Sequence, residues 1–375
     1  MQEIKILQIT KFFYPHFGGM EKVVRDINVG LKEDVNMKVL TCQVKGKGNK
    51  EIVDGIEVFR AGSIGTYFSV PISITFPFLL KKLSNDRDIL HFHLPFPLAV
   101  MSYLLVKPKG KIVVWWHSDI LRPKYLYKLL YKTFLRRFLN KVDKIIVATP
   151  LHIKNSDILN DFRDKCEVIP YGIDIEQFNF TNEIKEKAEK IRGEYGPKIV
   201  LFIGRLVYYK GLEYLIQAMK GVDAKVLIIG EGKLQRSLQK LAENLKIRGK
   251  VFFLGRVKNS DILTYYRACD IFVLPSIAKT EAFGLVQLEA MACGKPIVNT
   301  NLPTGVPYVS QNELTGLTVP PKDAKALSSA INSLLNDKIL RKKYGENGKR
   351  RVEKEFTKKI MIEKVFNVYK QLFEI

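Results

Sequence analysis

Residues 198–219 read KIVLFIGRLVYYKGLEYLIQAM, and this segment decides the fold class. Its first six residues are nearly all apolar, which indicates a strand that is buried on both faces of a sheet. A turn with two glycines follows, and the residues from Leu212 to Met219 have the pattern of a helix. A strand, a turn and a helix in this order form the repeating unit of parallel sheets, so the sequence predicts an α/β protein.

The same alternation of short apolar runs and longer amphipathic stretches extends along the chain in two series. We therefore expect two Rossmann-like domains, each built on a parallel sheet. The strands expected in the first series are Ile4–Ile9, Met37–Cys42, Ile56–Arg60, Asp88–Phe92, Lys111–Trp116, Lys144–Ala148 and Glu167–Ile169. Those expected in the second series are Lys198–Ile203, Lys225–Ile229, Val251–Leu254, Ile271–Leu274 and Pro296–Asn299.

The two series meet near Asp174, just ahead of a polar and highly charged stretch. We place the domain boundary there, which gives an N-terminal domain over residues 1–174 and a C-terminal domain over residues 175–356. A last amphipathic helix at about residues 357–375 needs a surface to cover, and we expect it to pack back on the first domain.

Composition limits the classes of protein that the chain can belong to. It has 375 residues, enough for two cores, and it shows neither a secretory signal nor a run of about 18 uncharged apolar residues, so we expect a cytoplasmic protein. The formal net charge of +23 predicts attraction to a polyanion, either nucleic acid, anionic lipid or a phosphorylated substrate. The cysteines are far apart and are expected as buried thiols without a zinc site: Cys42, Cys166, Cys269 and Cys293.

Two glycine-containing turns are candidates for phosphate binding. Gly18 and Gly19 follow the first strand and open a helix, where backbone N–H groups can approach a phosphate, although a tight turn alone is the alternative. After Ile203, the turn GRLVYYKG places Arg205 and Lys210 five residues apart, suited to straddle a pyrophosphate unless they are merely solvated loop charges. No G-x-G-x-x-G motif occurs, which disfavours an NAD enzyme.

The most specific motif is EAFGLVQLE over residues 281–289, in which seven residues separate two carboxylates. Phe283, Gly284 and Leu285 are expected to start a helix whose N–H groups face a phosphate. Glu281 then precedes the helix and Glu289 lies within it, and carboxylates are suited to accept hydrogen bonds from the vicinal hydroxyls of a sugar and a ribose.

Together with Gly230-Glu231-Gly232 and the segment Val168–Asp174, these motifs resemble glycosyltransferase family 4 over nearly the whole chain, in order. The resemblance implies the GT-B fold, with two Rossmann-like domains that face a central cleft. It implies that the N-terminal domain binds an acceptor, that the C-terminal domain binds a nucleotide sugar as donor, and that no cofactor is needed. Glu281 would bind the donor sugar, Glu289 the ribose, and Arg205 and Lys210 the diphosphate. The other implied donor contacts are Gly18, Gly19, Glu231, Arg256, Val257, Phe283, Gly284 and Leu285.

His117 follows the expected strand Lys111–Trp116. A lone histidine in such a place is more often structural, but this one resembles the family's histidine near the anomeric carbon. The resemblance implies that it touches the donor sugar and helps the developing positive charge, without acting as a nucleophile. Asp119 and Glu21 are candidates for contact with the acceptor.

We expect no metal. Asp86-Arg87-Asp88 has the D-x-D spacing of the other glycosyltransferase fold but precedes a strand instead of following one. His91 and His93 alternate along that strand, so we expect them to point to opposite faces and not to ligate one ion together. Arg205 and Lys210 would supply the positive charge that a divalent ion otherwise provides.

Residues 122–141 carry seven cationic side chains and no acidic one, with aromatic and aliphatic residues between them at helical spacing. This pattern is typical of a helix that lies on an anionic membrane, and the alternative is a core helix with a solvated basic face. Tyr67–Lys82 is a candidate for a second contact or for a groove that holds an acceptor lipid. The expected membrane contacts are Lys124, Tyr125, Lys128, Tyr131, Lys132, Phe134, Arg136 and Arg137.

The resulting hypothesis is a retaining, metal-independent hexosyltransferase that uses a UDP or GDP sugar. By the resemblance, its acceptor is an undecaprenyl-diphosphate-linked oligosaccharide of O-antigen or capsule assembly, at the inner face of the cell membrane. Two rivals stay open at this point: a nucleotide-sugar epimerase of the same fold, and a basic nucleic-acid-binding protein. The second is disfavoured because no nucleic-acid-binding module is recognised in the sequence.

Overall fold

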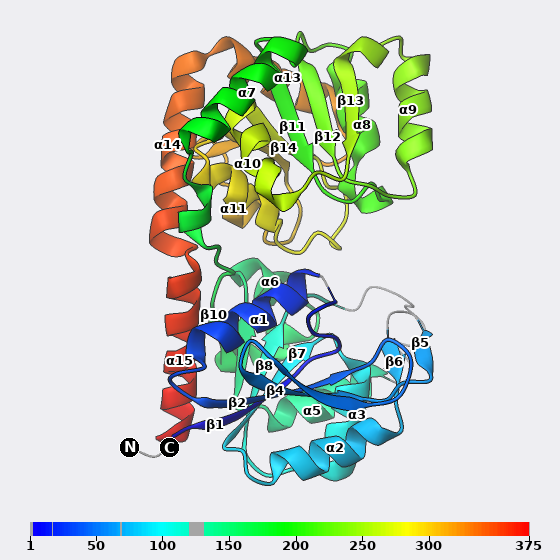
Figure 1. The fold of residues 1–375 in the computed structure, drawn as a ribbon, viewed down its shortest axis with the longest axis vertical. Helices are drawn as coiled ribbons and strands as arrows, with labels where there is room; N and C mark the ends of the chain where they lie inside the picture. The colour runs from blue at the N-terminus through cyan, green and yellow to red at the C-terminus, as the bar shows by residue number, and fades with distance from the viewer. Residues whose placement is uncertain (1–2, 17, 68–69, 120–130, 375) are drawn as a thin grey trace. The chain divides into compact units, whose positions relative to one another are not determined.

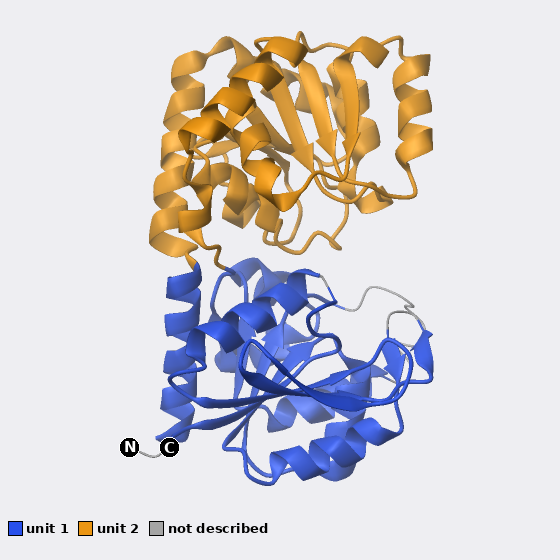
Figure 2. Cartoon of the chain, viewed as in Figure 1, with its two compact units in different colours: residues 1–171, 358–375 blue, residues 172–357 orange. Residues whose placement is uncertain are grey.

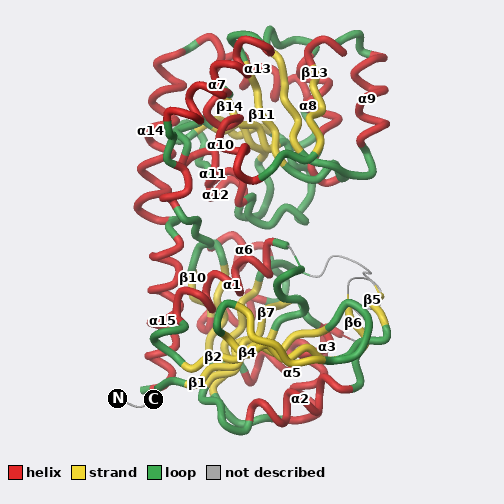
Figure 3. The backbone as a smooth tube through the Cα atoms, viewed as in Figure 1, coloured by secondary structure: helices red, strands yellow, loops and turns green. Residues whose placement is uncertain are grey.

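The structure is a computed structural model that describes residues 3–16, 18–67, 70–119 and 131–374. The chain divides into two compact units, which Figure 2 shows in different colours. Unit 1 comprises Met1–Tyr171 and Lys358–Ile375, and unit 2 comprises Gly172–Thr357. In each unit, helices surround a mostly parallel sheet (Figures 1 and 3), so the predicted pair of Rossmann-like α/β domains is confirmed.

Unit 1 is built on an eight-stranded sheet with the strand order β10-β9-β8-β7-β1-β2-β4-β3. Neighbouring strands are parallel except β3 and β4. The strands are β1 (Lys5–Ile9), β2 (Asn36–Cys42), β3 (Asn49–Val53), β4 (Ile56–Ala61), β7 (Ile89–Leu94), β8 (Lys111–Trp116), β9 (Lys144–Val147) and β10 (Cys166–Val168), with the separate pair β5 (Gly65–Tyr67) and β6 (Val70–Ile72). The α-helices are α1 (Gly19–Leu31), α2 (Thr75–Ser84), α3 (Pro97–Val106), α5 (Lys132–Lys141), α6 (Pro150–Asn155) and α15 (Lys358–Phe373).

The last helix, α15, packs against α1 within unit 1. The two helices pack so closely that a Cβ added to Gly30 of α1 would lie 2.2 Å from Cδ1 of Ile362 in α15. Lys358, at the start of α15, forms an ion pair with Asp26 of α1 at 3.6 Å. Tyr369 lies on the buried face of the helix, so α15 contributes a polar group to the interior of this unit.

Unit 2 is built on a six-stranded parallel sheet with the order β13-β12-β11-β14-β15-β16. The strand order reverses between β11 and β14, and such a switch point is where parallel sheets of this class bind ligands. The strands are β11 (Ile199–Ile203), β12 (Lys225–Ile229), β13 (Val251–Gly255), β14 (Ile271–Leu274), β15 (Ile297–Thr300) and β16 (Gly316–Val319). The α-helices are α7 (Asn182–Tyr195), α8 (Leu212–Met219), α9 (Gln235–Asn244), α10 (Asn259–Ala268), α11 (Leu285–Ala292), α12 (Val306–Val309), α13 (Ala324–Asn336) and α14 (Lys338–Glu355).

The strands that were not predicted lie at the edges of the sheets or in a small separate pair. The edge strand β3 has no buried residue, so it lacks the apolar run that revealed the central strands. β5 and β6 have three residues each, and β16 has four. None of these three strands is a continuous run of buried residues.

The basic segment predicted to lie on a membrane is only partly described. Lys124, Tyr125 and Lys128 lie outside the described residues. In α5, which is described, the apolar residues Leu135, Phe138 and Leu139 are buried in the core of unit 1. Arg136 forms an ion pair with Asp161. The described part of the segment therefore has the packing of the alternative, a core helix with a solvated basic face. Tyr131, Lys132 and Phe134 are partly buried, and Arg137 is exposed.

Candidate functional site

The candidate site in unit 2 is formed by loops that leave β11 and β14, the two strands at the switch point. Lys210 follows β11, and Ser276 and Glu281 follow β14. Because the strands are parallel neighbours, their carboxyl ends lie at the same edge of the sheet. Residues separated by about seventy positions in the sequence are thereby brought into contact.

Lys210 and Glu281 form an ion pair, with 2.5 Å between Nζ and Oε2. Each residue is only 8% exposed, so solvent screens the pair weakly. The Ser276 hydroxyl donates a hydrogen bond to the same carboxylate oxygen at 3.0 Å. The sequence predicted both charged residues as donor ligands but did not predict that they partner each other, and it missed Ser276, for which no motif gave a signal.

Glycines allow the loops around this pair to pack backbone against backbone. A Cβ on Gly211 would lie 2.1 Å from the carbonyl oxygen of Pro275, and one on Gly230 would lie 2.0 Å from that of Gly204. Gly211 and Gly230 also have positive φ values of 64° and 130°, which other residues rarely adopt. The positions of these loops, and of Lys210 between them, therefore depend on glycine.

Helix α11 begins beside Glu281, and among the described residues no side-chain cap is found at its amino end. Gly284 precedes the helix with φ 77°, and Phe283 is buried. The first N–H groups of a helix lack partners within it and carry partial positive charge, so this end is suited to bind an anion. Leu285 is the first helical residue, as the sequence predicted to within two positions.

Glu289 lies within α11 and is half-buried. Its Oε2 accepts a hydrogen bond from the hydroxyl of Tyr266 at 2.9 Å. Burial, and then the nearby Glu289 carboxylate, raise the pKa of Tyr266 far above its ordinary value, so the phenol keeps its proton. Tyr266 is therefore a fixed donor that orients Glu289, a role that the sequence gave no reason to assign.

The other predicted donor residues of unit 2 lie on the loops after β11, β12 and β13. Arg205 is exposed, and its guanidinium donates a hydrogen bond to the hydroxyl of Tyr209 at 2.9 Å. Glu231 and Arg256 have exposed side chains, and Val257 is partly buried. The main-chain oxygen of Glu231 accepts a hydrogen bond from the N–H of Leu206 at 2.9 Å, which ties two of these loops together.

In unit 1, Gly18 and Gly19 lie at the start of α1, after β1. Gly18 has extended backbone, and a Cβ there would lie 2.2 Å from Oε2 of Glu21. Glu21 is 8% exposed, and its charge opposes the lowering of the pKa of Lys11 that burial causes. Gly18 thus leaves room for the carboxylate of Glu21 over the first turn of the helix.

His117 follows β8 and is buried, with both ring nitrogens close to protein partners. Nδ1 lies 2.7 Å from the hydroxyl of Tyr171, and Nε2 lies 3.0 Å from Nδ1 of His93. Burial lowers the pKa of His117 to about 3, so the ring is neutral near pH 7. The predicted contact with a donor sugar stays a prediction.

The expectation that His91 and His93 point to opposite faces was wrong. Their rings stack with centroids 4.4 Å apart, because residues two positions apart on a strand share a face. Asp119 also lies near this end of β8, where its Oδ1 accepts hydrogen bonds from Nε1 of Trp116 at 3.0 Å and from the hydroxyl of Ser156 at 2.9 Å.

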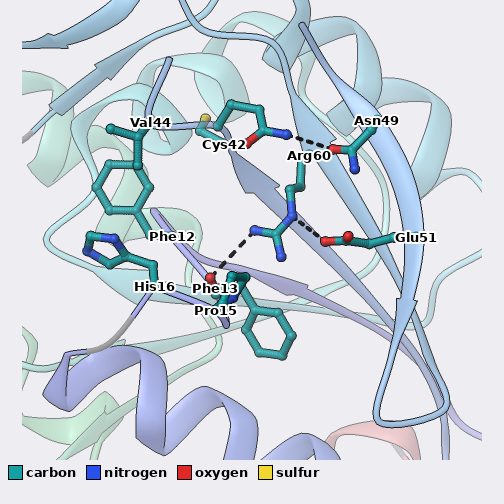
Figure 4. Close-up of a pocket in the computed structure, with 10 residues that line it drawn as sticks. Phe12, Phe13, Pro15, His16, Cys42, Val44, Asn49, Glu51 and Arg60 are labelled. Atoms are coloured by element: carbon teal, nitrogen blue, oxygen red, sulfur yellow. Dashed lines mark hydrogen bonds and ion pairs between the residues drawn. The ribbon is translucent and has the colours of Figure 1, made fainter. Parts of the chain in front are cut away.

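Unit 1 also contains a cavity of about 430 Å³ at the carboxyl ends of β1 and β2, beside β3 and β4 (Figure 4). Arg60 extends along its wall, forms an ion pair with Glu51 and donates a hydrogen bond to the carbonyl oxygen of Phe13. Gln43 donates a hydrogen bond to Asn49 at 2.7 Å. The cavity thus combines amide and charged groups with aromatic ones, a mixture suited to a sugar. Neither Glu21 nor Asp119 lines it.

Comparisons with known proteins identify the family of the chain. The model of Glycosyltransferase Family 4 matches residues 17–177, and that of Glycosyl transferases group 1 matches residues 183–351. O-antigen chain mannosyltransferase C of Escherichia coli is 31% identical over 373 residues, which cover 99% of each chain. The GDP-mannose-dependent monoacylated alpha-(1-6)-phosphatidylinositol monomannoside mannosyltransferase of Corynebacterium glutamicum is 35% identical, with 97% of each chain covered.

Among solved structures, the crystal structure of Anabaena Alr3699/HepE in complex with UDP superposes with a TM-score of 0.77. It is 20% identical, and the match covers 98% of this chain and 100% of that one. The likeness confirms the predicted GT-B fold.

Proposed function

The chain belongs to glycosyltransferase family 4, and on that premise we propose that it is a retaining hexosyltransferase that uses a UDP or GDP sugar. The observation that carries the proposal is the buried pair of Lys210 and Glu281 beside the amino end of α11. A diphosphate at this place would meet the lysine, the guanidinium of Arg205 and the N–H groups of the helix. Two relatives are named as mannosyltransferases, one of them GDP-mannose-dependent, so GDP-mannose is the first donor to test.

The same groups suggest how the reaction proceeds. As the bond to the sugar breaks, negative charge develops on the leaving phosphate, where Lys210, Arg205 and the helix end stabilise it. Retention through a covalent intermediate would need a carboxylate nucleophile. Glu281 is a poor candidate because Lys210 and Ser276 already bind its carboxylate. We therefore favour a front-face displacement in which the leaving phosphate accepts the proton of the acceptor hydroxyl, without a metal.

A transfer assay tests this proposal. Purified protein, GDP-mannose and a lipid-linked glycan acceptor should give a product whose new bond keeps the anomeric configuration of the donor, as read by NMR. The rate should be the same with and without a chelator of divalent ions. Inverted configuration would contradict the proposed mechanism. Conversion of the donor into a different nucleotide sugar without acceptor would instead indicate the rival epimerase, and DNA binding with a steep salt dependence but no donor binding would indicate the nucleic-acid-binding rival.

We further propose that the acceptor glycan binds in unit 1, in the cavity beside Arg60. The amides of Gln43 and Asn49 and the carboxylate of Glu51 are the kinds of group that bind sugar hydroxyls. Replacing Asn49 by alanine should raise KM for the acceptor and leave the affinity for the donor unchanged, because no residue that lines the cavity is among those predicted to bind the donor. Equal KM values for Asn49→Ala and wild type would contradict acceptor binding in the cavity. Glu21 and Asp119 stay candidates for contact with the reacting hydroxyl.

We place the enzyme at the inner face of the cell membrane, where an undecaprenyl-diphosphate-linked acceptor of O-antigen or capsule assembly would be available. No helix within the described ranges has the length and apolar character needed to cross a bilayer. Unit 1 nevertheless exposes several large apolar side chains on or beside β5, β6, α2 and α3, which we call the apolar patch. It consists of Ile64, Tyr67, Ile72, Ile74, Phe78, Met101 and Leu105, between 39% and 76% exposed.

The spacing of the apolar patch favours membrane contact. Ile74 immediately precedes α2 with helical backbone and lies four positions before Phe78, and the exposed Lys81 and Lys82 follow Phe78 at helical spacing. Leu105 extends the patch onto α3, which packs against α2. Apolar groups flanked by lysines are the pattern of a surface that inserts shallowly into an anionic bilayer, where each lysine contributes roughly 1 kcal/mol. This surface replaces α5 as the main contact, since the apolar side of α5 is buried.

Vesicle sedimentation tests the membrane proposal. Vesicles rich in phosphatidylglycerol should bind the protein, and vesicles of phosphatidylcholine should bind it much less. The double variant Lys81→Gln/Lys82→Gln should weaken binding by roughly 2 kcal/mol, about 30-fold. The matched control, Lys342→Gln/Lys343→Gln, removes two exposed lysines of α14 in unit 2 and should bind as wild type does. Equal losses in both variants would show that net charge, and not the patch, determines binding.

A further inference from the structure

A buried network of two side-chain amides lies beside the start of α11. Gln287 belongs to the first turn of this helix and Asn299 to strand β15, which contacts the helix, and both side chains are fully buried. Nε2 of Gln287 donates to the carbonyl oxygens of Phe283 and Val306, each at 3.3 Å. Its Oε1 accepts from Nδ2 of Asn299 at 2.8 Å. The amide of Gln287 thus has a partner for each of its two hydrogens and for its oxygen.

Asn299 anchors Gln287 to the main chain of unit 2. Nδ2 of Asn299 also lies 3.2 Å from the carbonyl oxygen of Val306 and 3.1 Å from that of Ser310. Its Oδ1 accepts from the hydroxyl of Thr318 at 2.7 Å. Carbonyl oxygens only accept, so the nitrogen end of each amide must face them. An inverted Gln287 amide would place its oxygen against two carbonyl oxygens, so only one orientation is compatible with these partners.

The bond to Phe283 controls the main chain at the point where α11 starts. Phe283 precedes the helix, and the next residue, Gly284, has a φ of 77°. In a trans peptide the C=O and the N–H point in opposite directions. A bond that holds the carbonyl of Phe283 therefore also fixes the direction of the N–H of Gly284. Because that carbonyl points to the buried amide of Gln287, the N–H of Gly284 points away from it.

The preceding peptide is held in the same way by a main-chain bond. The carbonyl oxygen of Ala282 accepts from the N–H of Gly305 at 2.7 Å, which fixes the direction of the N–H of Phe283. The residue after Gly305 is Val306, whose carbonyl oxygen binds Gln287. Two consecutive N–H groups at the start of α11 are thereby directed by one connected set of bonds.

We propose that Gln287 is a positioning residue that directs the N–H of Gly284 toward a phosphate oxygen of the donor. This inference deepens the proposed function and rests on it, because it takes the donor to bind at this end of α11. A hydrogen bond from an N–H to a phosphate is charge-assisted, so its geometry strongly affects affinity. Gln287 is fully buried, so it acts through the main chain and not by touching the donor.

Gln287→Met removes the amide and keeps the length of the side chain. It should weaken binding of GDP or UDP, whichever the wild type binds, roughly 10- to 100-fold by calorimetry. The matched control is Thr318→Val, which removes another hydrogen bond of the same network and leaves the bond to Phe283 in place. Both variants should lower the stability of unit 2, but Thr318→Val should leave the affinity for the nucleotide unchanged.

A selectively labelled sample of the full chain reads the peptide itself by NMR. With ¹³C-carbonyl phenylalanine and ¹⁵N-glycine, only Phe–Gly peptides give a carbonyl-to-amide correlation. The sequence contains two such pairs, Phe17-Gly18 and Phe283-Gly284. Phe17→Leu removes one of the two signals and so assigns the other to Phe283-Gly284. This one signal reports both the carbonyl that Gln287 binds and the N–H that faces the donor.

Without any ligand, Gln287→Met should move the carbonyl shift of Phe283 upfield, because that carbonyl loses a hydrogen bond. Thr318→Val should leave the carbonyl shift where it is. Addition of the nucleotide should shift the N–H of Gly284 in the wild type and much less in Gln287→Met. A structural role of Gln287 alone would lower stability in both variants but would not produce this difference.

An unchanged carbonyl shift in Gln287→Met would overturn the proposal, as would wild-type affinity for the nucleotide in the folded variant or an equal loss of affinity in Thr318→Val. If Gln287→Met does not fold, the wild-type spectrum still decides, because a Gly284 N–H that does not respond to the bound nucleotide overturns the proposal. Absence of glycosyl transfer by a protein that binds the nucleotide would refute the proposed function alone. Binding of neither GDP nor UDP would refute both.

Discussion

The ion pair of Lys210 and Glu281 allows a quantitative test of the candidate site. Their side chains are 9% and 10% exposed, so removing one charge leaves the other buried without compensation. Breaking a buried pair in this way typically costs about 3–5 kcal/mol of stability. For a unit the size of unit 2, each kcal/mol corresponds to roughly 2–4 °C in the melting temperature. At the lower limit, about 3 kcal/mol, Lys210→Met should melt unit 2 roughly 6–12 °C lower.

Urea denaturation followed by circular dichroism, together with calorimetry, measures this effect. The double variant Lys210→Met/Glu281→Gln has no uncompensated charge and keeps an acceptor for Ser276, so it should recover most of the lost stability. The matched control is Lys187→Met, which breaks the exposed pair with Glu183 and should leave the melting temperature of unit 2 unchanged. The reasoning is refuted if Lys210→Met destabilises unit 2 no more than Lys187→Met does, or if the double variant is as unstable as the two single changes combined.

Gly230, Tyr266 and the buried histidines of unit 1 can each be tested separately. Gly230→Ala should abolish donor binding and destabilise unit 2, because its Cβ would lie 2.0 Å from the carbonyl oxygen of Gly204; a donor affinity equal to that of the wild type, by calorimetry, would contradict this. Tyr266→Phe should cost about 1.5–3 kcal/mol in urea denaturation, because it removes a partly buried hydrogen bond to the charged Glu289; a change below about 0.5 kcal/mol would show that the bond contributes little. Burial lowers the pKa of His91 and of His117 to about 3, below the ordinary value near 6.5. As the pH falls, these histidines therefore bind protons in the unfolded chain before they do so in the folded one. Unit 1 should consequently lose stability as the pH falls below about 6.5. The loss should approach roughly 1.4 kcal/mol per pH unit for each of these histidines, and pH-independent melting of unit 1 between pH 7 and 5 would be inconsistent with their burial.

Much of the fold could be predicted from the sequence because the central strands are buried on both faces. β14 consists entirely of buried apolar residues and so stands out as an apolar run, and β8 does so after its first residue. β3 could not be recognised in the same way, because it lies at an edge with no buried residue. The error over His91 and His93 was one of strand geometry, since residues two positions apart point to the same side.

The sequence predicted which residues form the candidate site, but not which of them contact each other. Sequence spacing indicated that Lys210 and Glu281 belong to one site, but only the parallel pairing of β11 with β14 brings them to 2.5 Å. Tyr266 carried no signal, because a tyrosine on the buried side of a helix looks like an ordinary core residue. Its role depends on the tertiary contact to Glu289.

The most direct test of the central claim is a calorimetric titration with a panel of UDP and GDP sugars, repeated on Glu281→Ala and Glu289→Ala. We predict that one nucleotide sugar, GDP-mannose first among those to test, binds the wild type tightly. Both variants should bind it more weakly, and Glu183→Ala, which removes an exposed carboxylate of the same unit, should bind it as the wild type does. If no member of the panel binds, or if the two site variants bind as tightly as the wild type, the donor site proposed here is wrong.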